Sequence, residues 1–370
     1  MTHPAPTIQQ QLADWFMRGV SSSGVRRVKP LAAAAATDTG TVRRDNQDRV
    51  AVARGRTGDG LKFAIAAVAD GIGGMKEGAW CASNALAELL SSVFCYLQDG
   101  DSSKTCLEQA VRDANDLVHF QSGLTGGTTL VALLIVEGSP PCWTSVGDSR
   151  LYLVTDKLVQ LSKDDTIAGQ LGRRANIALE QSKLLQFVGV GEQLEIYVEN
   201  VFADQEDTAL LTTDGVHFLE RSGGVFDLVV HNSPDVGTCV KRLTELARWA
   251  GGPDNASAVA IPLFHDFSEF PILPHSLEVW DAFGELRIST RVERRAEKSR
   301  RQWHSKNAVP YGETEIASEE VLAAEVKIHE IPSNIVKPDP KKKKRKPRKK
   351  IDLTESNVPQ VQLKFSGKDD

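Results

Sequence analysis

Apolar residues recur along the chain at two spacings, one typical of helices and the other of buried strands. A helical spacing near the start predicts an amphipathic helix within residues 1–36, followed by a Ser-rich, basic linker. The four residues that carry this spacing are Ile8, Leu12, Trp15 and Phe16. The pattern is dense over residues 37–265, where we expect the main ordered domain. It weakens afterwards, so residues 266–370 are predicted to form a largely disordered extension.

Inside the dense region the pattern predicts both helices and strands. Apolar residues three and four apart predict helices over 77–98 and around 107–118, and a helix start at Ser233, Pro234 and Asp235 predicts a third that runs to Gly251. Short apolar runs predict strands at 61–69, 129–136, 142–146, 151–154, 158–161, 208–215 and 256–264. The four strands between residues 129 and 161 are expected to form a meander. A further helix is predicted around residues 287–302.

Composition restricts the class of protein. The chain has 370 residues, of which 41% are hydrophobic, so it is long enough to bury a large core. Its five cysteines have no CxxC spacing, which favours reduced thiols in a reducing compartment. No apolar run is long enough to span a bilayer, and "LAAAAA" at 31–36 is too short for a secretory signal. We therefore expect a cytoplasmic protein without a membrane partner.

Charge divides the chain into two parts. The net charge is −5, yet the segment "KKKKRKPRKK" at 341–350 holds nine basic residues and no acidic one, so the rest of the chain is strongly acidic. A run of like charges without an apolar face is expected to be disordered and accessible. It is either a solubilising tail or a tether to a polyanion, such as nucleic acid, or to an acidic partner.

Three aspartates stand where a predicted strand meets a turn. Asp70 follows the apolar run 61–69, Asp214 follows "LLTT", and Asp254 precedes the strand at 256–264. Carboxylate oxygens without His or Cys suit Mg²⁺ or Mn²⁺. Asp-Gly and Asp-Asn are also common turn dipeptides, so position alone leaves both a metal site and ordinary turns open.

Eight blocks in order resemble the protein phosphatase 2C family of metal-dependent Ser/Thr phosphatases, and most closely its compact bacterial members. They are "TDTGTVRRDNQDRV" (37–50), "VADGIGG" (68–74), "GGTTL" (126–130), "VGDSRLYL" (146–153), "LSKDDT" (161–166), "LLQFVGV" (184–190), "LLTTDGV" (210–216) and "GGPDNASAVAI" (251–261). The resemblance covers residues 37–265. It implies an α+β fold, a two-sheet antiparallel β-sandwich flanked by helices, with metals in a cleft at one edge.

The resemblance also implies roles for single residues. Asp70 would bridge two ions of Mn²⁺ or Mg²⁺ and Gly71 would offer its carbonyl, while Asp214 and Asp254 would complete one metal. Asp48 would hold water around the ions. The remaining implied roles are phosphate binding by Arg43, support of the Asp254 loop by Asn255, and a weak third metal at Asp148. The adjacent Arg44 leaves a shift of the phosphate-binding role by one residue open.

Several positions depart from the family pattern. Phe218 stands where the acid partner of Asp148 is expected, so the third metal site is in doubt. Gln47 replaces a glutamate, and Ile72 occupies the position of a histidine proposed as general acid in animal members. Met75 and Lys76 replace the usual histidine after the glycines. Arg173 and Arg174, in the segment that corresponds to the substrate flap, either meet acidic substrate or are solvated.

The implied function is hydrolysis of phosphoserine and phosphothreonine in proteins by a metal-activated water, reversing a Ser/Thr kinase. No covalent phosphoenzyme is required. The alternative is a catalytically weak or inactive scaffold with the phosphatase fold, which acts through its N- and C-terminal extensions.

Overall fold

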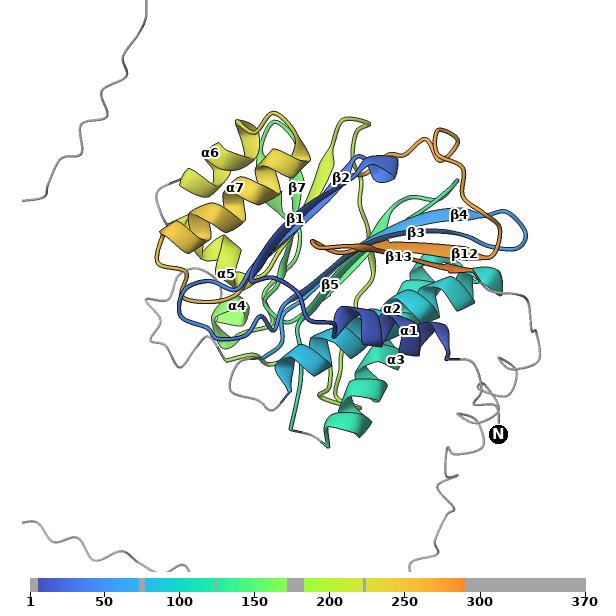
Figure 1. Cartoon of the computed structure of the whole chain (residues 1–370), viewed down its shortest axis with the longest axis horizontal. Helices are drawn as coiled ribbons and strands as arrows, with labels where there is room; N and C mark the ends of the chain where they lie inside the picture. Colours follow the sequence, from blue (N-terminus) through green and yellow to red (C-terminus); the bar gives the residue numbers. More distant parts are fainter. Residues whose placement is uncertain (1–5, 73–76, 124, 172–182, 222–223, 290–370) are drawn as a thin grey trace, which may run out of the picture. The chain divides into compact units, whose positions relative to one another are not determined.

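The structure, a computed structural model, describes residues 6–72, 77–123, 125–171, 183–221 and 224–289. Two antiparallel sheets of six and seven strands pack face to face, and helices cover both outer faces (Figure 1). The predicted basic run at 341–350 and the flap arginines Arg173 and Arg174 lie outside the described residues, as do Met75 and Lys76.

The first sheet joins strands from both halves of the chain. Its order is β1 (Ser23–Val28), β2 (Ala33–Asp38), β11 (Ala256–Pro262), β10 (Thr208–Thr212), β7 (Arg150–Val154) and β8 (Leu158–Gln160). The second sheet has the order β13 (Glu285–Ser289), β12 (Ser276–Trp280), β3 (Arg49–Arg56), β4 (Lys62–Ala69), β5 (Leu130–Val136), β6 (Cys142–Val146) and β9 (Glu199–Asn200). Every neighbouring pair of strands is antiparallel.

Helices α1 (Ile8–Phe16), α2 (Gly78–Gln98) and α3 (Ser103–Ser122) share a core with the seven-stranded sheet. On the other side, α6 (Val225–His231) and α7 (Val236–Trp249) share a core with the six-stranded sheet. Shorter elements complete the chain: η1 (Lys29–Leu31), α4 (Ile167–Leu171), α5 (Asp214–His217) and η3 (Phe218–Arg221). The result is a four-layer αββα arrangement.

Strand β4 shows why its sequence is continuously apolar. Alternate side chains point to opposite faces of a strand. Phe63 and Ile65 therefore lie in the core beneath α2, whereas Ala66 and Val68 lie in the core between the two sheets. Because both faces of β4 are covered, polar residues do not alternate with apolar ones along it.

The predicted helices at 8–16, 77–98, 107–118 and 235–251 are confirmed within a few residues. The Asp235 side chain accepts a hydrogen bond of 2.9 Å from the Thr238 N–H, so it is the N-cap of α7. Helix α1 begins with a capping box between Thr7 and Gln10. Local sequence signals therefore located these helix boundaries well.

The predicted meander is wrong. Strands β5 and β6 pair in the seven-stranded sheet, but β7 and β8 belong to the six-stranded sheet. The turn at Gly147–Asp148–Ser149 therefore carries the chain from one sheet to the other. An apolar strand can be buried in either sheet, so its pattern does not identify its neighbour.

The predicted end of the ordered region near residue 265 needs correction. Strands β12 and β13 lie beyond it, and β12 pairs with β3 over Ser276–Trp280. Arg287 lies in β13, so the helix predicted around 287–302 is wrong over its first residues, and residues 290–302 are outside the described part. The hairpin was missed because β13 is short and its outward side chains are charged. The linker predicted before residue 37 is wrong as well, because β1 and β2 pair there as strands of the six-stranded sheet. The division into a catalytic domain and an extension remains a prediction.

None of the five cysteines forms a disulfide bond in the described part of the chain, and four of them are buried. Among the described residues, no helix combines the length and apolar character that crossing a membrane requires.

Candidate active site

Two acidic residues meet at one end of the seven-stranded sheet. Strands β3 and β4 pair with Arg49 opposite Ala69. Asp48 directly precedes β3 and Asp70 directly follows β4, so the antiparallel register brings these two carboxylates to the same edge. Residues 22 positions apart in the sequence thus become neighbours through strand pairing.

The six-stranded sheet places three more acids at its own edge. Thr212, the last residue of β10, pairs with Ala258 of β11 and with Arg150 of β7. Asp214 follows β10, while Asp254 and Asp148 shortly precede β11 and β7. The same antiparallel logic gathers these three carboxylates beside one another.

A direct hydrogen bond joins the two acidic edges. The Thr213 hydroxyl donates to Asp48 Oδ2 over 2.9 Å, and the Thr213 oxygen accepts from the Ser257 N–H at 3.0 Å. Asp48 itself is 2% exposed. The acids of both sheets therefore form one cluster, made of Asp48, Asp70, Asp148, Asp214 and Asp254, which we name the carboxylate cluster.

Burial and mutual repulsion raise the pKa values of Asp48, Asp70, Asp148 and Asp214. Burial, together with the charge of Asp48, raises the pKa of Asp70 well above its ordinary value. Burial is also the largest cause for Asp48 and for Asp148, whose pKa values rise to about 7, and for Asp214, whose pKa rises to about 6. Neighbouring acids add to each shift. Such a set of like charges favours a bound cation.

Two buried oxygens in the cluster lack a hydrogen-bond partner. They are Asp48 Oδ1 and Asp214 Oδ1. An unpaired buried carboxylate oxygen is costly, and hard divalent ions prefer this type of ligand. In the described ranges, no group of three or more His, Cys, Asp or Glu side chains is arranged to hold a metal ion. The donor chemistry of the cluster fits Mg²⁺ or Mn²⁺, because these ions keep several water ligands beside one or two carboxylates.

Arg43 lies against the exposed side of the carboxylate cluster. Its Nη2 is 2.7 Å from Asp254 Oδ2, and the Arg43 side chain is 42% exposed. The hydrogen bond that Arg43 donates to Asp254, with the charges of Asp254, Asp214 and Asp70, raises the pKa of Arg43. The guanidinium is therefore placed where it can meet both the cluster and a ligand from solvent.

Asn255 ties the Asp254 turn to the loop that carries Arg43. Its Oδ1 accepts from the Gln47 N–H at 2.8 Å, and its Nδ2 donates to the carbonyls of Thr39 and Asp45 at 2.9 and 3.1 Å. Asn255 is 4% exposed. Its amide is satisfied on both sides, so it fixes the relative position of the two loops.

Two glycines of the quoted motifs lie in close contact with neighbouring backbone. A Cβ atom at Gly71 would lie 2.4 Å from the carbonyl carbon and oxygen of Gly78, and one at Gly215 would lie 1.8 Å from the Asn255 carbonyl oxygen. A side chain at either position would push apart segments that carry the acids. Asp70 is thus followed by a glycine because the packing of the site leaves no room for a side chain at position 71.

Comparisons with known proteins identify the family, although no protein-family model matches the chain. The serine/threonine phosphatase stp of Listeria innocua is 32% identical over 196 residues, covering 49% of this chain and 75% of that protein. The crystal structure of the PPM Ser-Thr phosphatase MsPP from Mycobacterium smegmatis is 31% identical, with a TM-score of 0.50, and covers 63% of this chain and 98% of MsPP. The chain belongs to the PPM phosphatase family.

Other PPM relatives show how much of each protein the similarity covers. The serine/threonine protein phosphatase PstP of Mycobacterium tuberculosis is 33% identical over 245 residues, which are 61% of this chain but only 44% of PstP. This chain therefore spans less than half the length of PstP. The catalytic domain of PstP, solved with two manganese ions, is 30% identical with a TM-score of 0.50, and 98% of it is covered. These PPM structures confirm the predicted two-sheet fold.

The family resemblance led us to expect an acid at position 218 as the partner of Asp148. Phe218, at the position of the missing acid, packs against the core of the six-stranded sheet and α7. The next acid, Glu220, accepts from Arg150 Nη1 at 2.8 Å and from the Tyr152 hydroxyl at 2.8 Å. Glu220 therefore does not replace the acid that the family pattern expects.

Two threonines that hold acids of the site in place were not predicted from the sequence. Thr213 links the sheets, and the Thr129 hydroxyl accepts from the Asp70 N–H at 3.0 Å. Both threonines lie inside quoted blocks, "LLTTDGV" and "GGTTL", where a second threonine was the available signal. No role for Arg49 was predicted from the sequence either.

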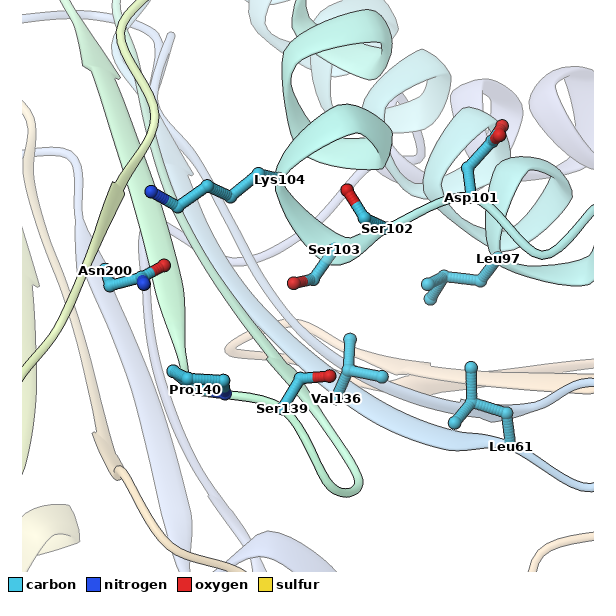
Figure 2. Close-up of a pocket in the computed structure, with 10 residues that line it drawn as sticks. All are labelled: Leu61, Leu97, Asp101, Ser102, Ser103, Lys104, Val136, Ser139, Pro140 and Asn200. Atoms are coloured by element: carbon cyan, nitrogen blue, oxygen red, sulfur yellow. The ribbon is translucent and has the colours of Figure 1, made fainter.

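A separate pocket lies at the other end of the strands (Figure 2). Leu61, which precedes β4, and Val136, which ends β5, line a cavity of about 320 Å³ together with Lys104 near the start of α3. Asp70 follows the opposite end of β4. The pocket is therefore distinct from the carboxylate cluster.

Proposed function

We propose that this PPM chain is a metal-dependent protein serine/threonine phosphatase. One observation carries the proposal: acids from both sheets gather at one edge, with buried oxygens left unpaired, directly beneath Arg43. A cation set held by carboxylates next to a guanidinium is suited to binding a phosphate dianion. The activity, substrates and partners of the whole chain belong to this proposal.

The carboxylate cluster would hold two ions of Mn²⁺ or Mg²⁺. We assign Asp70, Asp214 and Asp254 as carboxylate ligands and the carbonyl of Gly71 as a backbone ligand. Such ions, when bound, supply the positive charge that activates a water and neutralises the phosphoryl group during in-line displacement. PstP was solved with two manganese ions, which supports this assignment.

The protein's own groups would orient the reactants. Arg43 presents a planar fork that can bind two phosphate oxygens, a geometry that lysine lacks. Asp48, held by the Thr213 hydroxyl, would orient water at the floor of the site. Asn255 keeps the Arg43 loop and the Asp254 turn together. Ile72 offers no proton donor, so we assign no side chain as general acid.

The test measures release of phosphate from an aryl phosphate and from a phosphothreonine peptide, with Mn²⁺ and with a chelator. We expect hydrolysis with Mn²⁺ and none with the chelator. The matched control for substitutions of the acids in the carboxylate cluster is Asp156→Asn, because Asp156 is an exposed acid in the turn between β7 and β8. Hydrolysis that is unaffected by the chelator would contradict the proposal.

The substrate class follows from the same site. We infer that phosphoserine and phosphothreonine proteins are the substrates and that a Ser/Thr kinase acts in opposition, as the names of stp and PstP suggest. We also place the reaction in the cytoplasm, because five cysteines without a disulfide bond suit a reducing compartment. Co-purification of the chain with a kinase from its own source tests this inference.

The basic run at 341–350 is proposed as a tether to a polyanion or an acidic partner, outside the chemistry of the site. A chain that ends at Pro340 should keep its turnover of aryl phosphate and lose retention on DNA at low salt. Equal retention of both chains would exclude the tail as the binding segment. The alternative of an inactive scaffold is not favoured, because Asp70, Asp214 and Asp254 are all present.

A further inference from the structure

Arg49, the first residue of β3, follows Asp48 directly and bridges two parts of the molecule. Its Nη1 donates to the carbonyls of Asn46 and Asp48 at 2.8 and 2.7 Å. Its Nε donates to the carbonyl of Phe16 and to Ser83 Oγ, both at 2.9 Å. All four of these acceptors, within the described part of the chain, are uncharged oxygens.

This environment is costly for a cation. Burial lowers the pKa of the Arg49 guanidinium, against the attraction of Asp48 and Asp281. A half-buried guanidinium that bonds to neutral oxygens gains less electrostatic stabilisation than a guanidinium in a direct ion pair. The four hydrogen bonds therefore point to a geometric role, because only a guanidinium reaches separate acceptors from one rigid plane.

The turn that Arg49 holds is connected to three parts of the site. The Asn46 side chain donates to Thr37 Oγ1 and accepts from the Asp48 N–H, at 2.8 and 3.0 Å. The N–H of Gln47 donates to Asn255, and its carbonyl accepts from the Gly71 N–H at 3.3 Å. Movement of residues 46–48 would therefore displace the Asp254 turn, Asp48 and the backbone after Asp70 together.

The other end of the bridge is helix α1. Phe16 is its last residue, and a helix leaves its final carbonyls without partners inside the helix. Leu12 and Phe16 are buried in the core that α1 shares with α2. Beyond the helix, Arg18 stacks on Trp15 and forms two hydrogen bonds, of 2.9 and 2.7 Å, with Asp281 at the turn after β12. Helix α1 is thus fixed to α2 and to the β12–β13 hairpin.

We propose that Arg49 is a positioning residue of the active site, which holds residues 46–48 against the end of α1 and so aligns the carboxylate cluster. The inference rests on the function proposed above. It makes α1 a working part of the catalytic domain.

The test uses the full chain with three variants. Arg49→Met removes the guanidinium, Arg49→Lys keeps the charge without the planar fork, and Arg54→Met is the matched control. Arg54 is a buried arginine on the same strand, 2.7 Å from Glu278, and lies five positions farther from the site. Unfolding in urea, kcat and KM on a phosphothreonine peptide, and calorimetric Mn²⁺ affinity are measured for each.

We expect Arg49→Met to weaken Mn²⁺ affinity and kcat/KM by about 10- to 100-fold, the range found when partners of metal ligands are removed. Arg49→Lys should fall between this variant and wild type. Arg54→Met should lose stability while its Mn²⁺ affinity and KM stay at wild-type values. This contrast separates positioning from a general loss of stability.

Two results would overturn the inference, and a third would separate it from the proposed function. If Arg49→Met loses only stability, as Arg54→Met does, Arg49 is merely structural. If Arg49→Met does not fold, wild-type Mn²⁺ affinity and KM in Arg49→Lys would overturn the inference instead. If wild type hydrolyses no phosphoester, the proposed function fails, and the calorimetric comparison of wild type with Arg49→Lys still decides the positioning role.

Discussion

The hydroxyl of Thr213 donates a hydrogen bond of 2.9 Å to Oδ2 of Asp48, and these residues are 165 positions apart in the sequence. Thr213 directly follows β10 of one sheet, and Asp48 directly precedes β3 of the other. The same oxygen accepts from the Ser257 N–H, which belongs to β11. One buried hydroxyl therefore sets the distance between the acidic edges of the two sheets.

Replacement of Thr213 by valine should destabilise the protein and impair the site. Valine keeps the shape but leaves the Ser257 N–H and Asp48 Oδ2 without this partner, a loss of about 1–3 kcal/mol in the free energy of unfolding. Urea denaturation measures it, and Mn²⁺-dependent turnover should fall with it. Thr213→Ser keeps the hydroxyl and is the control. Equal stability of the valine and serine variants would show that the hydrogen bond contributes nothing.

Replacement of Asp214 or Asp254 by asparagine should abolish Mn²⁺-dependent hydrolysis while the protein stays folded. An amide has the shape of the carboxylate but no charge for a metal ion. We expect less than about a tenth of the wild-type rate, a loss of more than about 1.4 kcal/mol of transition-state stabilisation. Phosphate release and circular dichroism measure the two parts. A folded variant that keeps a larger share of the rate would remove that residue from the metal site.

Arg43 and Arg44 can be separated by single substitutions. Arg43 contacts Asp254, so Arg43→Ala should keep Mn²⁺ binding and lower kcat/KM on a phosphoprotein. About tenfold is expected for loss of one bidentate phosphate contact. Arg44→Ala is the matched control and should have wild-type kinetics. The reverse result would move the phosphate-binding role to Arg44.

Calorimetric titration with Mn²⁺ should reveal no more than two tight sites. Phe218 packs into a core and cannot ligate, and Glu220 is bound to Arg150 and Tyr152, so neither residue supplies the acid that a third metal beside Asp148 is expected to need. Asp148→Asn should therefore leave the number of tight sites unchanged. Three tight sites in the wild-type chain would contradict this view of Asp148.

Stability in acid should depend on His265. Burial lowers the pKa of His265 to about 4 from an ordinary value of 6.5, and its Nε2 is buried without a hydrogen-bond partner. The unfolded chain therefore binds more protons than the folded chain between these two pH values. The contribution of His265 to stability is complete above about pH 6.5 and is lost as the pH falls toward 4.

Urea denaturation of wild type and His265→Gln across this range measures that contribution. The free energy of unfolding should fall more steeply with acid in wild type than in the variant. The buried carboxylates have raised pKa values and act in the opposite direction over part of this range, so the difference between the two proteins isolates His265. Parallel curves would show that His265 stays solvated.

Local features of the fold could be predicted because they depend on neighbouring residues. Helical spacing and capping located α1 and α7, and the apolar run 61–69 located β4 with Asp70 at its end. The assignment of strands to sheets could not be predicted in this way. The segments that became β7 and β12 required partners far along the chain, and a strand's pattern shows that it is buried without showing beside which strand.

The same division applies to the site. The sequence by itself determined which acids stand at strand ends, that their oxygens suit hard ions, and that Arg43 lies near Asp48 in the chain. Only the tertiary structure decided that Asp48 meets Thr213 and that Arg49 reaches Phe16. These contacts join residues from different layers, and their geometry comes from the packing of two sheets and a helix rather than from any local preference. A spacing along the chain specifies a face or an end of an element, whereas a hydrogen bond between layers exists only once those layers have packed.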